Sequence, residues 1–240
     1  MEIAKSDRSA CIEMLFSDQT DDLTARIRLA HQAGFAAVEF WRWSTKDLDA
    51  IAAALRETGL TVAGFVAEPM VSLNDPANHD GFLAALPASI ATAQRLGAPF
   101  LYVQGGSTMP DVPRTAQTEA LTQLLRRAAD GLHGTGVTLL LEPVSDARDG
   151  FLTRAAEGLP IIAAVDRPEV RLLLDLFHVA MAGEDLRATV AGHADLIAHI
   201  HVADHPGRGA PGTGTLTLAA DLDWLRAQGY RGLFGMEHHP

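Results

Sequence analysis

Short apolar segments rich in β-branched and aromatic residues alternate with longer helix-like segments along the whole chain. Eight such runs are predicted to be strands, at residues 10–15, 36–41, 61–66, 99–104, 137–142, 170–175, 197–202 and 232–237. Helical periodicity is found between them, near residues 20–34, 46–59, 78–97, 115–134, 153–165, 184–193 and 218–228. The strands are apolar almost throughout, which is typical of a parallel sheet buried on both faces.

Eight strands separated by seven helices in 240 residues predict a (β/α)8 TIM barrel, with a single domain over residues 1–240. Glycines stand where C-terminal helix caps belong, at Gly34, Gly59, Gly97, Gly134 and Gly229. A doubly wound open sheet is the alternative, but no GxGxxG turn follows an early strand and no break suggests a second domain. No eighth helix is expected after the last strand, because the chain stops at Pro240.

The charge balance limits the classes of partner. The chain has 30 Asp and Glu against 19 Lys and Arg, a formal net charge of -11, and no basic cluster, so no nucleic-acid partner is expected. Its single cysteine, Cys11, excludes an intrachain disulfide. No apolar run approaches the roughly 20 residues of a membrane span, and the N-terminus has no signal-like core. We therefore expect a cytoplasmic protein without a membrane partner.

Four consecutive predicted strands end in side chains that can bind a metal: Glu142, Asp175, His201 and Glu237. In a barrel of this kind the active site lies at the carboxyl ends of the strands, so all four should face one opening. Three carboxylates brought together without a cation would repel one another. Together with one imidazole they suit Mn²⁺ or Mg²⁺, with Co²⁺ and Zn²⁺ as further candidates. One acidic strand end would be read as a loop residue or helix cap, but four in succession favour a divalent-metal site.

Several segments carry a family resemblance: "AHQAGFAAVEFWRW", "LLLEPVSD", "LLLDLFHVAMAGEDL", "HIHVADHPGRGAPGTG" and "GYRGLFGMEHHP". Together they resemble the hydroxypyruvate isomerase family. That family belongs to the sugar isomerase/epimerase barrels, which also include ketose 3-epimerases and the endonuclease IV type. The resemblance spans nearly the whole chain and implies that the metal ligands are Glu142, Asp175, His201 and Glu237.

The activity implied by this resemblance is an aldose–ketose type isomerisation of a small hydroxy-carbonyl substrate. Moving a carbonyl to the neighbouring carbon requires the removal of one proton and the return of another. A bound divalent metal would stabilise the intervening enediolate as a Lewis acid, and two carboxylates would transfer the protons. Glu142 and Glu237 are the candidate acid/base pair, with Asp175 and His201 as ligands only.

Four further residues are candidates for binding substrate. His178 and Arg208 match a histidine and an arginine that contact substrate in the family. Glu39 and Gln104 end the second and fourth predicted strands at the same rim, with orientation of neighbouring groups as the alternative for Glu39. His199 lies on the inward face of its strand and is expected to be a hydrogen-bonded interior histidine.

The chain departs from the family pattern in places that bear on the substrate. Hydroxypyruvate isomerases usually have Gln at the third ligand position, whereas ketose epimerases have His, as here at His201. The loop "PVSDARDG" is short, and "GTLTL" replaces the family's Gly-Glu-Ile-Asn-Tyr. Of the aromatic pair Trp41 and Trp43, one is a candidate wall of the pocket.

Alternative functions remain open on these grounds. A ketose 3-epimerase or a dehydratase acting on a related sugar-like substrate would use the same metal site. A non-catalytic sugar-binding barrel would not need the two carboxylates, and an endonuclease IV-like enzyme would need more histidines and a basic surface. A homo-oligomer is also considered, because a partner subunit could cover the place of the eighth helix.

Overall fold

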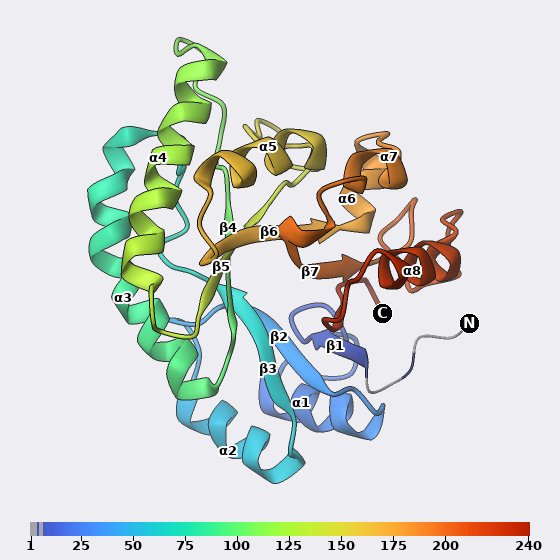
Figure 1. The fold of residues 1–240 in the computed structure, drawn as a ribbon. Helices are drawn as coiled ribbons and strands as arrows, with labels where there is room; N and C mark the ends of the chain where they lie inside the picture. Colours follow the sequence, from blue (N-terminus) through green and yellow to red (C-terminus); the bar gives the residue numbers. More distant parts are fainter. Residues whose placement is uncertain (1–3, 5–6) are drawn as a thin grey trace.

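Eight parallel strands form a closed barrel in sequence order in the computed structural model, which describes residue 4 and residues 7–240 (Figure 1). The strands are β1 (Arg8–Cys11), β2 (Ala37–Arg42), β3 (Thr61–Val66), β4 (Phe100–Gln104), β5 (Thr138–Glu142), β6 (Val170–Asp175), β7 (Ile197–Val202) and β8 (Phe234–Met236). The barrel closes where β1 pairs with β8, with Ala10 opposite Met236. The predicted (β/α)8 barrel is confirmed.

The helices lie around the outside of the barrel (Figure 1). They are α1 (Leu23–Gln32), α2 (Leu48–Thr58), α3 (His79–Leu96), α4 (Arg114–Leu132), α5 (Ala155–Val165), α6 (Leu176–Met181), α7 (Leu186–Val190) and α8 (Leu218–Ala227), with 3-10 turns η2 (Pro76–Asn78) and η3 (Ala194–Leu196). Each of the seven predicted helical segments contains a helix. The short helix α6 was not predicted, because it follows β6 without a loop. In the part of the chain that the structure describes, no helix follows β8.

The first strand lies earlier than predicted. It spans Arg8–Cys11 rather than residues 10–15, and residues 12–15 form a turn. Ile12, Met14 and Leu15 are nevertheless buried in the main hydrophobic core. Their apolar character therefore reflects packing against neighbouring elements and not strand pairing.

Helix ends follow local chemistry. Gly59 and Gly97 take left-handed conformations (φ 73° and 68°) as C-caps of α2 and α3, where a side chain would be strained. Asp22 caps α1 by accepting a hydrogen bond from the Thr24 amide at 2.8 Å. These helix ends are thus set by the residues that cap them.

Two apolar layers support the barrel. A large cluster packs between the strands and the surrounding helices, and a small separate one contains Tyr102, Leu140 and Leu173. Leu140 and Leu173 lie two residues before Glu142 and Asp175 on their strands, so each pair shares a face of the sheet. The small cluster therefore fills the barrel interior below the carboxylates.

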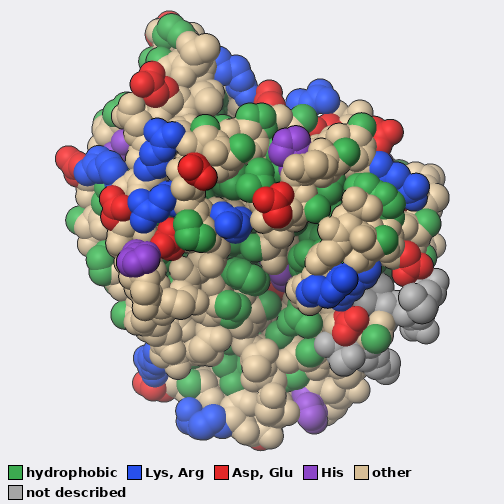
Figure 2. Space-filling model, in the orientation of Figure 1, with side chains coloured by type: hydrophobic (Ala, Val, Ile, Leu, Met, Phe, Trp, Pro, Cys, Tyr) green, Lys and Arg blue, Asp and Glu red, His purple; other side chains and the backbone are tan. Residues whose placement is uncertain are grey.

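The surface carries both signs of charge. Figure 2 shows Lys and Arg side chains interspersed with Asp and Glu on the face in view, without a continuous basic area. Among the described residues, no helix is both long enough and apolar enough to cross a bilayer.

Candidate active site

The four predicted metal ligands converge at one end of the barrel. Glu142 ends β5, Asp175 ends β6, His201 lies on β7 and Glu237 directly follows β8. Strand register brings them together, since Asp175 stands opposite His201, and His201 opposite Gly235. All four side chains are buried, and one ligand atom from each lies within 4.8 Å of the others.

The imidazole of His201 leaves one nitrogen without a hydrogen-bond partner inside this group. Its Nδ1 is buried and makes no hydrogen bond, although it lies 2.9 Å from Glu237 Oε2 and 3.7 Å from Glu142 Oε1. A buried nitrogen that faces carboxylates in this way is costly unless a proton on it or a bound cation offsets their charge. Three carboxylates and one imidazole form a donor set that fits a hard or borderline divalent ion.

Arg208 contributes a positive charge at the edge of the ligand group. Its Nη2 donates to Asp175 Oδ2 at 2.9 Å and to Glu237 Oε2 at 2.6 Å, and Nη1 lies 3.1 Å from His178 Nε2. The guanidinium also lies 4.9 Å from the centre of the Phe177 ring. Burial would lower the pKa of Arg208, but Asp175 and Glu237 raise it overall, so the side chain stays charged.

Arg208 reaches these partners from a left-handed backbone conformation, with φ 53°. Few non-glycine residues adopt it, and they do so where surrounding contacts hold them. The loop between β7 and α8 supplies such contacts through Asp204, whose carboxylate accepts hydrogen bonds from the amides of His205, Gly212 and Leu216. The Gly/Pro-rich loop is thereby ordered around a single buried carboxylate.

The two candidate acid/base glutamates have unequal surroundings. Glu237 Oε1 accepts the indole N–H of Trp41 at 3.0 Å and lies 3.5 Å from Cys11 Sγ, while Oε2 contacts Arg208. Glu142 has one weak side-chain contact of this kind, with Gln104 Nε2 at 3.5 Å. Glu237 is therefore held on both oxygens, and Glu142 is the freer of the two.

Charges around Glu237 and His201 favour their ionised forms. Burial would raise the pKa of Glu237, but His201, Arg208 and the Trp41 indole outweigh it and lower the pKa. Burial would likewise lower the pKa of His201, but Glu237 and Glu39 raise it well above its usual range. A metal bound here would have to displace the proton from Nδ1 of His201.

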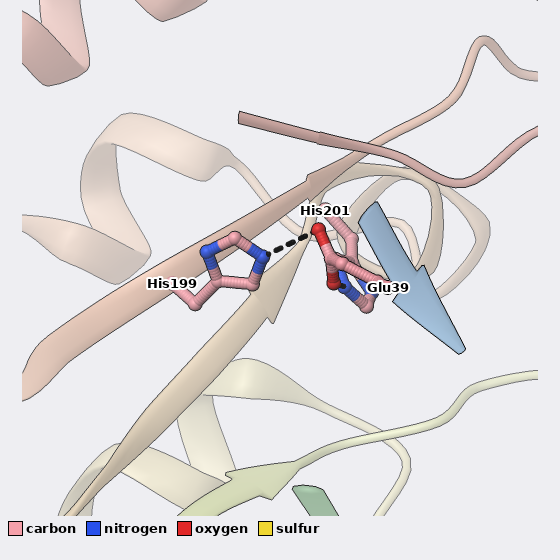
Figure 3. A group of neighbouring side chains, drawn as sticks. All are labelled: Glu39, His199 and His201. Atoms are coloured by element: carbon pink, nitrogen blue, oxygen red, sulfur yellow. Dashed lines mark hydrogen bonds and ion pairs between the residues drawn. The ribbon is translucent and has the colours of Figure 1, made fainter. Parts of the chain in front are cut away.

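Glu39 lies inside the barrel beside His201, one of the four predicted ligands (Figure 3). Its side chain is buried and contacts His199 Nε2 at 3.0 Å through Oε1 and His201 Nε2 at 2.9 Å through Oε2. Tyr102 and Ser9 also donate to it. The interior, hydrogen-bonded position expected for His199 is confirmed.

A cavity of about 550 Å³ opens over the group. Seven of the eight predicted site residues line this cavity: Glu39, Gln104, Glu142, His178, His201, Arg208 and Glu237. The exception is Asp175, which is buried and hydrogen bonded to Arg208. Of the two candidate tryptophans, Trp41 lines the cavity, whereas the Trp43 indole donates to Ser89.

Sequence reasoning missed three side chains that shape this site: Ser9, Cys11 and Tyr102. A signal existed for Tyr102, because it lies two residues before Gln104 and so shares its inward face. Ser9 precedes the range predicted for the first strand, and Cys11 was considered only for disulfides. Their contacts depend on the true position of β1.

The chain is similar to known proteins over most of its length. Hydroxypyruvate isomerase of Escherichia coli is 28% identical over 241 residues, which cover 97% of this chain and 93% of that protein. L-ribulose 3-epimerase of Mesorhizobium japonicum is 28% identical over 222 residues, covering 89% and 74%. The crystal structure of an AP endonuclease, family 2, from Brucella melitensis is 27% identical, superposes with a TM-score of 0.91, and covers 98% of this chain and 93% of that one.

The model of one protein family matches residues 27–240, which is most of the chain and includes all four converging ligand residues. The closed barrel, the strand-end carboxylates and the relatives that are isomerases and epimerases agree with this match. The chain belongs to the xylose isomerase-like TIM barrel family.

Proposed function

We propose that this protein is a divalent-metal-dependent isomerase that interconverts small hydroxy-aldehydes and hydroxy-ketones through an enediolate. One observation carries the proposal: Glu142, Asp175 and Glu237 converge with an unpaired His201 nitrogen beside a cavity of about 550 Å³. The E. coli relative, a hydroxypyruvate isomerase, supports a small hydroxy-carbonyl substrate.

Glu142, Asp175, His201 and Glu237 would hold the cation, with Mn²⁺ or Mg²⁺ favoured and Co²⁺ or Zn²⁺ as further candidates. When bound, the cation supplies Lewis-acid stabilisation of the negative charge that develops on the enediolate oxygens. Asp175 and His201 serve as ligands only, because their remaining polar atoms are already engaged by Arg208, the Phe177 amide and Glu39.

Proton transfer falls to the two glutamates. Glu142 is the better base for the first proton, because its carboxylate has few donors around it, whereas donors on Glu237 stabilise the ionised form and weaken it as a base. Glu237, which is ionised at the start, then takes the hydroxyl proton of the enediolate and delivers it to the neighbouring carbon, while Glu142 gives its proton to the former carbonyl oxygen. This division of roles follows from the unequal hydrogen bonding of two carboxylates in one pocket.

The substrate is oriented by polar groups at the pocket wall. Arg208 presents a fork of N–H donors, His178 lies 3.1 Å from it, and Gln104 lines the wall beside Glu142. The Trp41 ring lines the same cavity, and its indole N–H holds one oxygen of Glu237. These residues bind and position the substrate, and the glutamates carry the protons.

The proposal is tested by solvent deuterium incorporation into a panel of hydroxy-keto acids and small ketoses, with Mn²⁺ present. We expect the wild-type protein to exchange and isomerise at least one compound. Glu142→Gln should abolish both exchange and isomerisation, whereas Glu237→Gln should retain slow exchange but lose isomerisation. These substitutions keep side-chain volume, so circular dichroism spectra should match the wild type.

Chelation provides the control for metal dependence. Activity should vanish in excess chelator and return with Mn²⁺, Mg²⁺ or Co²⁺. Full activity after chelation, or deuterium exchange with none of the compounds, would refute the proposal. Full isomerisation by both Gln variants would refute the assigned glutamate roles alone.

A ketose 3-epimerase is the second candidate, favoured by His201 at the position where hydroxypyruvate isomerases usually have Gln. The L-ribulose 3-epimerase relative supports the same reading. The two activities share the proton chemistry and differ in product. Chiral chromatography of products from a 3-ketose panel decides between them, since epimerisation inverts one carbon and leaves the carbonyl in place.

A further inference from the structure

The carboxylate of Glu39 is hydrogen bonded on both oxygens inside the barrel (Figure 3). Oε2 accepts from Tyr102 OH at 2.7 Å and lies 2.9 Å from His201 Nε2. Oε1 accepts from the Ser9 hydroxyl and lies 3.0 Å from His199 Nε2. We call these five side chains the Glu39 network. It joins four strands, β1, β2, β4 and β7.

Glycines on two further strands make room for the Glu39 network. A Cβ at Gly235 on β8 would lie 2.5 Å from Glu39 Oε1 and 2.7 Å from His201 Cδ2. A Cβ at Gly64 on β3 would overlap the hydroxyl of Tyr102. Two strands thus carry glycine where any side chain would collide with the network, which indicates a built arrangement and not an accidental contact.

Glu39, His199 and His201 could themselves hold a cation, because their ligand atoms lie within 4.8 Å of one another. However, the two oxygens of Glu39 already face four donors, two on each. A carboxylate offers about four lone-pair sites, so none remains free for a metal. This cluster is better described as a hydrogen-bond network than as a second metal site.

The Glu39 network determines which nitrogen of His201 faces the other three proposed ligands. With Nε2–H donating to Glu39, the proton stays on Nε2, and Nδ1 is the nitrogen that faces Glu142 and Glu237. Either neutral tautomer sets a nitrogen lone pair 2.9 Å from a carboxylate oxygen, Glu39 Oε2 for Nε2 and Glu237 Oε2 for Nδ1. A cation held by Glu142 and Glu237 would relieve this repulsion on the Nδ1 side only, so the proton on Nε2 and the ion at Nδ1 belong together. Carboxylates that orient metal-binding histidines in this way also make the histidine a stronger ligand.

We propose that Glu39 is a positioning residue for the metal centre: it holds the proton on His201 Nε2 and aims Nδ1 at the ion, while the rest of the network saturates the carboxylate. The chain then binds one cation, not two. This inference rests on the proposed function, because it assumes that His201 is a ligand. It gives Glu39 a role without direct contact with the substrate.

The test measures Mn²⁺ binding to the full chain by isothermal titration calorimetry. We expect one ion per wild-type chain and an affinity about 10- to 100-fold lower for Glu39→Gln. Glutamine keeps the volume but can accept from only one imidazole, and it turns its NH₂ toward the other. Tyr102→Phe is the matched control, because it removes a donor from the same oxygen but leaves the His201 bond, and should cost less than tenfold.

A spectroscopic readout separates positioning from general loosening of the fold. In the Zn²⁺-loaded wild type, ¹⁵N spectra of labelled histidines should show His201 protonated on Nε2, with its Nδ1 signal shifted by the metal. Glu39→Gln should change the His201 tautomer or broaden that signal. Should this variant fail to fold, Glu39→Asp offers the same test, because the shorter side chain withdraws the carboxylate from His201.

Unchanged Mn²⁺ affinity in a folded Glu39 variant would overturn the inference. Two ions per wild-type chain, or a His201 that binds Zn²⁺ through Nε2, would do so as well. A wild-type protein that binds no Mn²⁺ would instead contradict the proposed function, so the two failures are distinguishable.

Discussion

Individual side chains around the pocket owe their chemistry to burial and neighbouring charge. Glu237 is buried yet favours its ionised form because cations and donors surround it. Cys11 Sγ lies 3.5 Å from the same carboxylate, and its surroundings favour the neutral thiol over the thiolate. Burial first, and then Glu237, raise the pKa of the Cys11 thiol well above its usual range. The thiol is therefore a buried weak donor and not a nucleophile.

Alkylation of Cys11 tests this description. Since the thiolate is the reactive form, iodoacetamide at pH 8 should modify the native protein at least tenfold more slowly than the urea-unfolded chain. Mass spectrometry follows the reaction without ambiguity, because Cys11 is the only cysteine. Equal rates for the native and unfolded chains would show that the thiol is neither buried nor stabilised by Glu237.

The loop between β7 and α8 shows how one residue organises an element. Asp204 is fully buried, and its carboxylate accepts backbone N–H groups from several turns of the loop that carries Arg208. Burial would raise the pKa of Asp204, but the amides of Gly214, Leu216, Gly212 and His205 lower it overall. The loop can therefore hold Arg208 in place without forming a helix or strand.

We expect Asp204→Asn to destabilise this loop by about 1–3 kcal/mol, because the amide NH₂ cannot accept and leaves a buried N–H unpaired. Urea unfolding gives the stability, and hydrogen exchange at Gly212 and Leu216 gives the local effect. Activity should fall mainly through KM, since Arg208 is displaced from the pocket. Unchanged exchange at both amides would contradict this description of the loop.

The pH dependence of that effect has a defined sign. The folded pKa of Asp204 lies below its unfolded value of about 3.9, so the ionised carboxylate stabilises the fold fully above that value. This contribution disappears as the pH falls through the lowered folded pKa. The stability difference between wild type and Asp204→Asn should be largest near pH 7 and shrink below about pH 4.

The barrel as a whole should be stabilised by the proposed metal, because its four proposed ligands come from β5, β6, β7 and the end of β8 and meet only in the folded chain. Free Mn²⁺ at 100 times its Kd should add about 2.7 kcal/mol to the free energy of unfolding. For a chain of this length that corresponds to a rise in Tm of about 5–10 °C. Differential scanning calorimetry with and without Mn²⁺ measures it.

Asp175→Asn is the control for this stabilisation. It retains the volume and part of the helix cap of α6 but removes one ligand charge, so Mn²⁺ should raise its Tm by clearly less. An equal rise in both proteins would place the ion elsewhere. No rise in the wild type would count against binding at the four strand ends.

Much of the architecture was predictable because it is encoded by local patterns. Apolar runs and helical periodicity repeat at regular intervals, and parallel strands place their carboxyl ends at one opening, so the convergence of Glu142, Asp175 and Glu237 followed from topology alone. The position of β1 was not predictable in this way. Residues 12–15 are apolar enough for a strand, but tertiary packing buries them in a turn.

Local patterns along the chain were enough to predict the barrel, the strand ends and the residue types available to a cation, since each depends on patterns a few residues long. The contacts of each nitrogen and oxygen followed from the folded barrel and not from those patterns. Glu39 meets Ser9, Tyr102, His199 and His201 across 30, 63, 160 and 162 residues of chain. Those contacts require the barrel to close at a particular register and glycines to clear the space. A hydrogen bond tolerates a change of only a few tenths of an ångström in its length. Local spacing along the chain does not encode positions that finely.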